Sequence, residues 1–249
     1  MSGHSKWSTI KRQKGVADAR RGQLFTKLTR EIMLAVREGG PSMDSNYALR
    51  LVVQKAKDNN MPSENIERAI KRASGEGGAA NLVEFTLEGY GPSGVAVLIE
   101  ALSDNRNRTV QEVRSLLSRQ GGSLGEVGCV SWLFDSRGLI TVEAGDQGED
   151  DVALMASDAG ADDVTSEDGY VEVYTEPTKM EDVRKALEND FRVVSADVSL
   201  IPKTSVMLEE SKASQVMNLI DTLEQLDDVQ KVYSNADFPE SVLEKASQS

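Results

Sequence analysis

The spacing of apolar residues changes near residue 76, and this change constrains the fold of the chain more than any other feature. Before it, apolar residues recur at the three- and four-residue intervals of amphipathic helices. Three helices are expected there, over residues 17–37, over residues 44–57 and around residues 66–73. From residue 83 to 87, apolar and polar residues alternate, as in a half-buried strand. The sequence therefore predicts a helical N-terminal part followed by a part that contains sheets.

The remaining chain contains two sets of strands and helices. Residues 138–201 are predicted to run strand, helix, strand, strand, helix, strand, the βαββαβ order of a ferredoxin-like unit. Because that unit is complete by itself, the strand, helix and strand of residues 205–233 must join the sheet of residues 82–135. A further strand is expected at residues 130–134. The predicted fold class is α+β, with an N-terminal three-helix domain plus two α+β domains, one of them an inserted ferredoxin-like βαββαβ unit.

The chain has 249 residues, which allows two or three domains at roughly 150 residues each. We expect a basic helical nucleic-acid-binding domain at 1–78, a discontinuous α+β domain at 79–136 plus 203–236, an inserted ferredoxin-like domain at 137–202 and a loose tail at 237–249.

Charge is divided unevenly along the chain. Residues 1–75 carry 15 basic and 7 acidic side chains, a net charge of +8, whereas the remainder carries 13 basic and 34 acidic side chains, a net charge of −21. Such an asymmetry is typical of a protein that binds nucleic acid through one domain. The alternative is a solvated surface that is merely uneven.

The candidate nucleic-acid-binding residues begin in a basic arm before residue 15. Trp7 follows Lys6 directly, and an aromatic beside a cation suits a phosphate contact next to a stacking platform for a base. The alternative for Trp7 is that it packs the arm onto the helices. The candidates in the arm are His4, Lys6, Trp7, Lys11, Arg12 and Lys14.

The first expected helix supplies four more candidates, Arg20, Arg21, Lys27 and Arg30. At 100° per residue, Lys27, Arg30 and Arg37 fall nearly opposite the apolar stripe of this helix. We therefore expect these three side chains to face outward.

A second basic cluster, Arg106 and Arg108, stands at the start of a predicted helix inside the acidic part. The helix macrodipole disfavours cations at that end. Compensation comes either from a carboxylate, such as Asp104 or Glu112, or from a bound phosphate, and both guanidinium groups are candidate nucleic-acid-binding residues.

Motifs for catalysis, cofactors and metals are weak. Residues 89–94 match G-x-G-x-x-G, but the following residues are predicted to form a strand, so a glycine-rich hairpin turn is expected instead of a dinucleotide site. One histidine, His4, and one cysteine, Cys129, leave little for nucleophilic or acid–base catalysis. Acidic pairs at predicted element ends suit solvated caps better than Mg²⁺ sites. We expect no enzyme activity, no cofactor and no metal.

Localisation follows from two further features. The single cysteine fits a reducing compartment, and no apolar run approaches the roughly 20 residues of a membrane span. The protein is expected to be cytoplasmic, without a secretion signal, a lipid anchor or a membrane partner.

Several segments together resemble the YebC/PmpR family. They are the segments at 3–7, 25–28, 37–40, 56–70, 88–92, 104–109, 121–125 and 227–235, so the resemblance covers essentially the whole chain. It implies a three-domain cytoplasmic protein of the kind usually labelled a probable DNA-binding transcriptional regulator. It also implies a rival role, because a mitochondrial relative activates translation and bacterial members have been tied to ribosomes and to stalling at proline runs. The expected function is non-enzymatic regulation of gene expression through nucleic-acid binding, as a DNA-binding transcriptional regulator. The alternative is a translation factor that binds the ribosome or ribosomal RNA and relieves stalling at proline runs.

Overall fold

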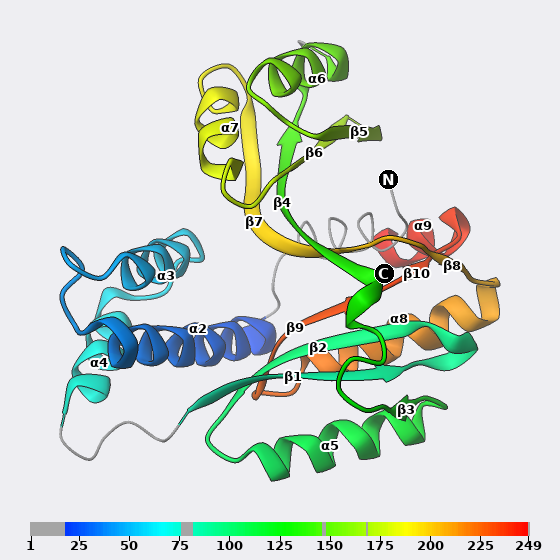
Figure 1. The fold of residues 1–249 in the computed structure, drawn as a ribbon, viewed down its shortest axis with the longest axis horizontal. Helices are drawn as coiled ribbons and strands as arrows, with labels where there is room; N and C mark the ends of the chain where they lie inside the picture. Colours follow the sequence, from blue (N-terminus) through cyan, green and yellow to red (C-terminus); the bar gives the residue numbers. More distant parts are fainter. Residues whose placement is uncertain (1–17, 76–81, 146–147, 168, 249) are drawn as a thin grey trace.

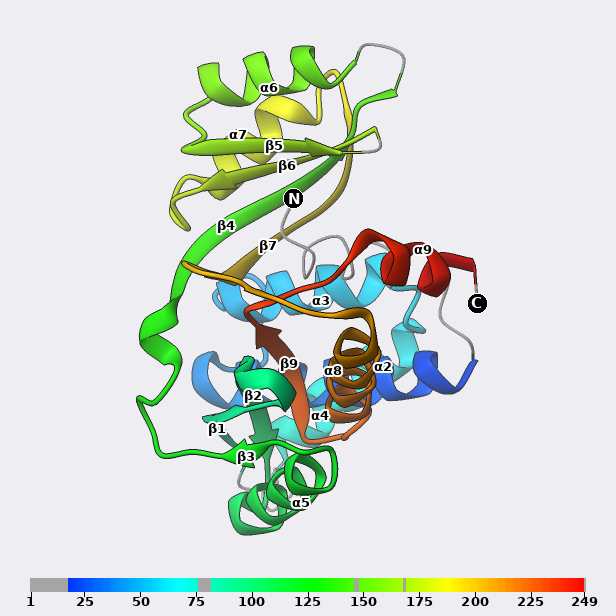
Figure 2. The same cartoon turned by 90° about the vertical axis from the view of Figure 1, so that its right-hand side faces the viewer.

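The computed structural model of the 249-residue chain describes residues 18–75, 82–145, 148–167 and 169–248. Figure 1 shows three groups of elements: a set of helices, a sheet with helices beneath it, and a second sheet with its own helices above. Figure 2, turned by 90°, shows the second sheet standing away from the other two groups. The fold is α+β, as the sequence predicts.

The helical group consists of α2 (Asp18–Gly39), α3 (Tyr47–Asp58) and α4 (Ser63–Ser74). Its core is formed by the predicted apolar stripes, which bury Leu28 and Ile32 of α2 against residues of both other helices. The helix α3 begins three residues later than predicted because Asn46 is its N-cap and accepts a hydrogen bond from the backbone N–H of Leu49. The three expected helices are confirmed.

The first sheet has the strand order β3-β1-β2-β9. Its strands are β1 (Val83–Tyr90), β2 (Ala96–Ser103), β3 (Ser123–Leu124) and β9 (Val229–Ser234). Strands β1 and β2 pair in an antiparallel hairpin across the short 3-10 helix η1 (Pro92–Gly94), which confirms the glycine-rich turn. Strand β9 pairs with β2 although more than a hundred residues separate them in sequence. The chain thus leaves this sheet and returns to it.

Two helices cover one face of the first sheet, α5 (Arg106–Arg119) and α8 (Glu210–Glu224) (Figure 1). Their buried residues Val113 and Ile220 share a core with Ile99 of β2. On the sheet's edge, strand β3 runs so close to β1 that a Cβ on Gly122 would lie 2.4 Å from the carbonyl oxygen of Tyr90. This approach requires glycine at position 122.

The second sheet has the strand order β5-β6-β4-β7 and helices on one face. Its elements are β4 (Phe134–Glu143), α6 (Glu149–Asp158), β5 (Asp163–Glu167), β6 (Tyr170–Thr175), α7 (Met180–Leu187) and β7 (Arg192–Pro202). The expected βαββαβ order is therefore present, with a separate core around Ile140 and Val173. Strand β4 begins three residues before the predicted domain boundary at 137, and the boundaries themselves stay a prediction.

The prediction of a strand at residues 130–134 is wrong, because residues Ser131–Leu133 form the 3-10 helix η2 and β4 begins only at Phe134. The cause is the buried carboxylate of Glu88. It accepts hydrogen bonds from the backbone N–H groups of Gly128 at 2.7 Å and of Val130 and Ser131 at 2.8 Å. These donors are turned toward the carboxylate and are not available to a neighbouring strand.

The C-terminal part also differs from the prediction. Strand β8 (Val206–Met207) does not join the first sheet; it pairs in parallel with β10 (Ala236–Asp237). The loose tail predicted at 237–249 is wrong for the described residues, because α9 (Glu240–Gln248) buries Val242 and Leu243 against the core of the first sheet. Among the described helices, none combines the length and the hydropathy that a membrane crossing needs.

Candidate nucleic-acid interface

The structure describes only some of the candidate nucleic-acid-binding residues, and none of those in the predicted basic arm. The candidates His4, Lys6, Trp7, Lys11, Arg12 and Lys14 lie outside the described residues. Arg20 lies in α2, but its side chain is likewise not described, and Arg21 follows it as an exposed residue of the same helix. The arm and Arg20 therefore remain candidates on sequence grounds alone.

Lys27 and Arg30 fasten the helical group to the rest of the protein. The Lys27 Nζ donates a hydrogen bond to the carbonyl oxygen of Glu224 at 2.7 Å, and Arg30 Nη1 donates to that of Asp227 at 2.7 Å. Both acceptors lie at or just after the C-terminus of α8, where carbonyl groups have no partner within the helix and favour cations. The expectation that Lys27 and Arg30 face outward is wrong, because α2 packs on two sides. Arg37 is exposed, as expected.

The carboxylate of Asp228 is the centre of this junction. It accepts hydrogen bonds from Arg30 Nη1 at 2.5 Å, Arg108 Nη2 at 2.8 Å, Thr109 Oγ1 at 2.6 Å and Ser103 Oγ at 2.9 Å. Its side chain is only 5% exposed. Burial by itself would raise the pKa of this carboxyl, but the four donors outweigh burial and lower the pKa from 3.8 to about 2.

The second basic cluster is explained by the same junction. Arg108 is ion-paired with Asp228 and, at 2.8 Å, with Asp104, so of the two alternatives the structure shows the carboxylate. The guanidinium of Arg106 lies 5.4 Å from the centroid of the Phe85 ring, in a cation–π contact. Neither arginine needs a bound phosphate to account for its position.

Three exposed basic residues of the helical group lie together on α4. Arg68, Lys71 and Arg72 are all exposed, and within the described parts of the chain none of them forms an ion pair or a side-chain hydrogen bond. Their signal in the sequence is their place off the apolar stripe of α4, which includes Ile66 and Ala69. The sequence-based choice of candidates emphasised the arm and α2, and it missed this surface.

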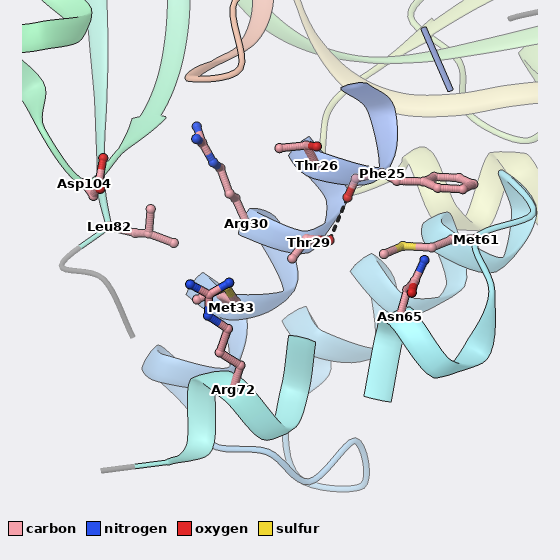
Figure 3. Close-up of a pocket in the computed structure, with 10 residues that line it drawn as sticks. All are labelled: Phe25, Thr26, Thr29, Arg30, Met33, Met61, Asn65, Arg72, Leu82 and Asp104. Atoms are coloured by element: carbon pink, nitrogen blue, oxygen red, sulfur yellow. Dashed lines mark hydrogen bonds between the residues drawn. The ribbon is translucent and has the colours of Figure 1, made fainter. Parts of the chain in front are cut away.

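A cavity of about 300 Å³ lies where the helical group meets the first sheet (Figure 3). Its wall combines apolar side chains with amide, hydroxyl and guanidinium groups from α2 and α4. The lining residues are Phe25, Thr26, Thr29, Arg30, Met33, Met61, Asn65, Arg72, Leu82 and Asp104.

One acidic run of the body lies at a helix N-terminus. The run Glu149, Asp150 and Asp151 occupies the first turn of α6, where the helix dipole favours carboxylates. Within the ranges that the structure describes, no group of three or more histidine, cysteine, aspartate or glutamate residues is arranged to hold a metal ion.

These features define a class: an α+β protein in which a small basic helical unit is fastened, through ion pairs and helix-end contacts, to an acidic body built on two antiparallel sheets. Residues 5–76 match the TACO1/YebC protein N-terminal domain, and residues 82–236 match the TACO1/YebC second and third domain. The chain belongs to the TACO1/YebC family.

Curated relatives share one name, and a solved structure shares the fold of this chain. A probable transcriptional regulatory protein of Dehalococcoides mccartyi (strain ATCC BAA-2266 / KCTC 15142 / 195) is 57% identical over 246 residues, 98% of each chain. A second, from Halothermothrix orenii, is 50% identical over 249 residues, also 98% of each chain. A conserved hypothetical protein from Aquifex aeolicus, solved by crystallography, has a TM-score of 0.80 and 43% identity, covering 90% of this chain and 93% of that one.

Proposed function

We propose that this protein is a non-enzymatic, cytoplasmic regulator of gene expression that binds nucleic acid through its helical unit. The observation that carries the proposal is the exposed face of α4, where Arg68, Lys71 and Arg72 have no ionic partner among the described residues. Residues 18–75 hold 11 basic and 7 acidic side chains, whereas the part after residue 75 has a net charge of −21. A polyanion is attracted to the helical unit and repelled by the body. The names of the relatives support a regulatory role.

Duplex DNA is the first target to consider. The helices α3 and α4 are joined by only four residues, 59–62, a connection compatible with a helix-turn-helix arrangement. With α4 at the major groove, Asn65 and Arg68 are the side chains suited to base edges, and Lys71 and Arg72 suit phosphates.

Ribosomal RNA is the second candidate target, and one observation favours it. The cavity beside α4 combines an apolar wall with guanidinium groups, which suits an unpaired nucleotide better than a base within a duplex. Recognition of folded RNA needs phosphate contacts and shape, which the basic face of α4 and the arm can supply.

The salt dependence of binding tests the proposed surface. On duplex DNA each neutralised phosphate contributes about 0.9 to the slope of log K against log salt, and on a single strand about 0.7. The triple variant Arg68→Gln, Lys71→Gln and Arg72→Gln should therefore bind every sequence more weakly and reduce the slope by roughly 2 to 3.

The matched control changes three basic residues of the body that already form ion pairs, Arg137→Gln, Arg184→Gln and Arg192→Gln. It removes the same charge and should leave the slope as in the wild type. A wild-type slope in the α4 variant, or an equal loss in the control, would contradict the proposed surface.

The arm is tested in the same assay. Lys11→Ala, Arg12→Ala and Lys14→Ala together should also lower the slope by roughly 2 to 3. Trp7→Ala should instead weaken binding to single strands with little change of slope, by about 1 to 3 kcal/mol if the indole stacks on a base. Loss of thermal stability together with all binding would assign Trp7 to packing.

Sedimentation of the tagged protein with ribosomes, before and after nuclease treatment, distinguishes the two targets. Co-sedimentation that survives DNase and is lost with RNase assigns the protein to RNA. Failure to sediment with ribosomes, combined with salt-dependent binding to duplex DNA, assigns it to DNA.

A further inference from the structure

The cavity between the helical unit and the first sheet, called the slot below, is lined by two polar side chains of α4, Asn65 and Arg72, in addition to residues of α2. Asn65 and Arg72 are seven residues apart on α4, so they lie on one face of the helix and about 10 Å apart along its axis. Opposite them, Phe25, Thr29 and Met33 recur every four residues along α2. In Figure 3, Asn65 lies on the side of Met61, and the guanidinium of Arg72 lies toward Met33.

Most polar groups of the slot already have partners. The hydroxyl groups of Thr26 and Thr29 donate to carbonyl oxygens of their own helix at 3.1 Å and 2.7 Å. Arg30 is held by Asp228, and Asp104 is paired with Arg108. These groups shape the slot but are not its open donors and acceptors.

Two polar side chains of the slot remain open to a ligand. Neither the amide of Asn65 nor the guanidinium of Arg72 forms a side-chain hydrogen bond or ion pair with the residues that the structure describes. An amide donates and accepts at once and matches the edge of a base, whereas a guanidinium matches a phosphate. The separation between the two along α4 is comparable to that between the outer edge of a nucleobase and its own phosphate.

The slot also has an apolar lining. It comprises the ring of Phe25, the thioethers of Met33 and Met61, and the side chain of Leu82. An aromatic ring and flexible thioethers suit the flat face of a heteroaromatic ring. A small polar anion such as free phosphate would leave this surface unused.

We propose that the slot holds one nucleotide, with its base against Phe25 and Met61, the base edge on Asn65 and the phosphate on Arg72. This inference rests on the proposed nucleic-acid binding and deepens it, because only an unstacked base can enter such a slot. The nucleotide belongs to an unpaired strand or is a free mononucleotide, and the slot recognises the same chemistry in both.

The test compares two slot variants with a control on the same helix. Asn65→Leu removes the amide at similar size, and Arg72→Gln removes the guanidinium. The control Arg68→Gln makes the same charge change at an exposed position of α4 that does not line the slot. Affinities are measured on the full-length protein for a short oligoadenylate, an abasic strand of the same length, a duplex of the same length, and AMP.

Wild-type protein should bind the oligoadenylate about 5- to 150-fold more tightly than the abasic strand, the range given by stacking of one base. In Asn65→Leu and Arg72→Gln that ratio should collapse toward one, while in Arg68→Gln it should persist although all strands bind more weakly. Saturable binding of AMP by the wild type and not by Arg72→Gln would support the proposed slot. If the oligoadenylate does not compete with AMP, the slot is assigned to a free nucleotide.

The inference is overturned if both slot variants keep the wild-type ratio of oligoadenylate to abasic strand and the wild-type response to AMP. In that case unchanged salt-dependent binding of duplex or strand would leave the proposed function standing. Absence of any nucleic-acid binding by the wild type would instead remove the proposed function, and the inference with it.

Discussion

Asp228 should contribute more to stability than any exposed carboxylate of the chain, and Asp228→Asn tests this. The substitution keeps the size of the side chain but removes the negative charge of the carboxylate. That carboxylate accepts hydrogen bonds from Arg30, Arg108, Thr109 and Ser103. A pKa lowered from 3.8 to about 2 corresponds to about 2.5 kcal/mol of stabilisation of the charged form. Removal of one member of a buried pair costs about 3 to 5 kcal/mol in other proteins. We therefore expect a loss of about 2 to 5 kcal/mol in the free energy of unfolding at neutral pH.

The pH dependence has a definite sign. Because the folded-state pKa of Asp228 is lowered, its contribution is complete above the unfolded pKa near 4 and is lost as the pH falls from about 4 to about 2. The difference between wild type and Asp228→Asn should thus be constant between about pH 5 and pH 7 and should shrink below about pH 4. Other carboxylates are present in both proteins and largely cancel in this difference.

Urea unfolding followed by circular dichroism at several pH values measures both quantities. The matched control is Asp104→Asn, which removes the other carboxylate paired with Arg108, at a position where the side chain is 47% exposed. Its cost should be no more than about 1 kcal/mol. The reasoning is refuted if Asp228→Asn costs no more than Asp104→Asn, or if its cost is the same at about pH 3 as at neutral pH.

Three further changes test other parts of the fold. Glu88→Gln should lower the free energy of unfolding by about 1 to 3 kcal/mol, since three backbone donors including Gly128 lose a charged acceptor; protease cleavage within residues 126–133 should rise, and unchanged resistance would argue against this role. Gly122→Ala should cost about 1 to 3 kcal/mol, because its Cβ would meet the backbone oxygen of Tyr90; a thermal midpoint equal to that of wild type would contradict the close approach. Deletion of residues 240–248 should lower the free energy of unfolding by about 3 kcal/mol, because burial of two aliphatic side chains contributes about 1.5 to 3 kcal/mol each and the entropy lost in ordering the helix offsets part of it. A truncated protein as stable as the wild type would show that this segment does not stabilise the fold.

Elements set by local periodicity were predictable from the sequence. The helices α2 and α4 follow from single apolar stripes, and the return of β9 to the first sheet follows from the completeness of the βαββαβ segment before it. Each inference needed only neighbouring residues or a count of strands, and the structure confirms both.

Features that depend on distant residues were not predictable. The helical spacing of apolar residues in α2 identifies only its apolar face. It could not show that Lys27 and Arg30, on another face, contact the end of α8 almost two hundred residues later. The 3-10 turn at residues 131–133 depends on the distant Glu88. The sequence of α9 has too few apolar residues to predict a packed helix. The basic face of α4 was visible as a pattern, but its lack of ionic partners among described residues is a property of the folded chain.

The two long strands β4 and β7 belong to both halves of the body, and this has a mechanical consequence. They pair from Phe134 opposite Pro202 to Glu143 opposite Arg192, with one end packed on the outer face of the first sheet and the other end inside the second (Figure 2). Bending such a ribbon within its own plane would stretch one strand and compress the other, which covalent geometry resists, whereas bending across its face changes only soft torsions. The second sheet should therefore move relative to the first mainly in one direction, across the face of the ribbon that β4 and β7 form.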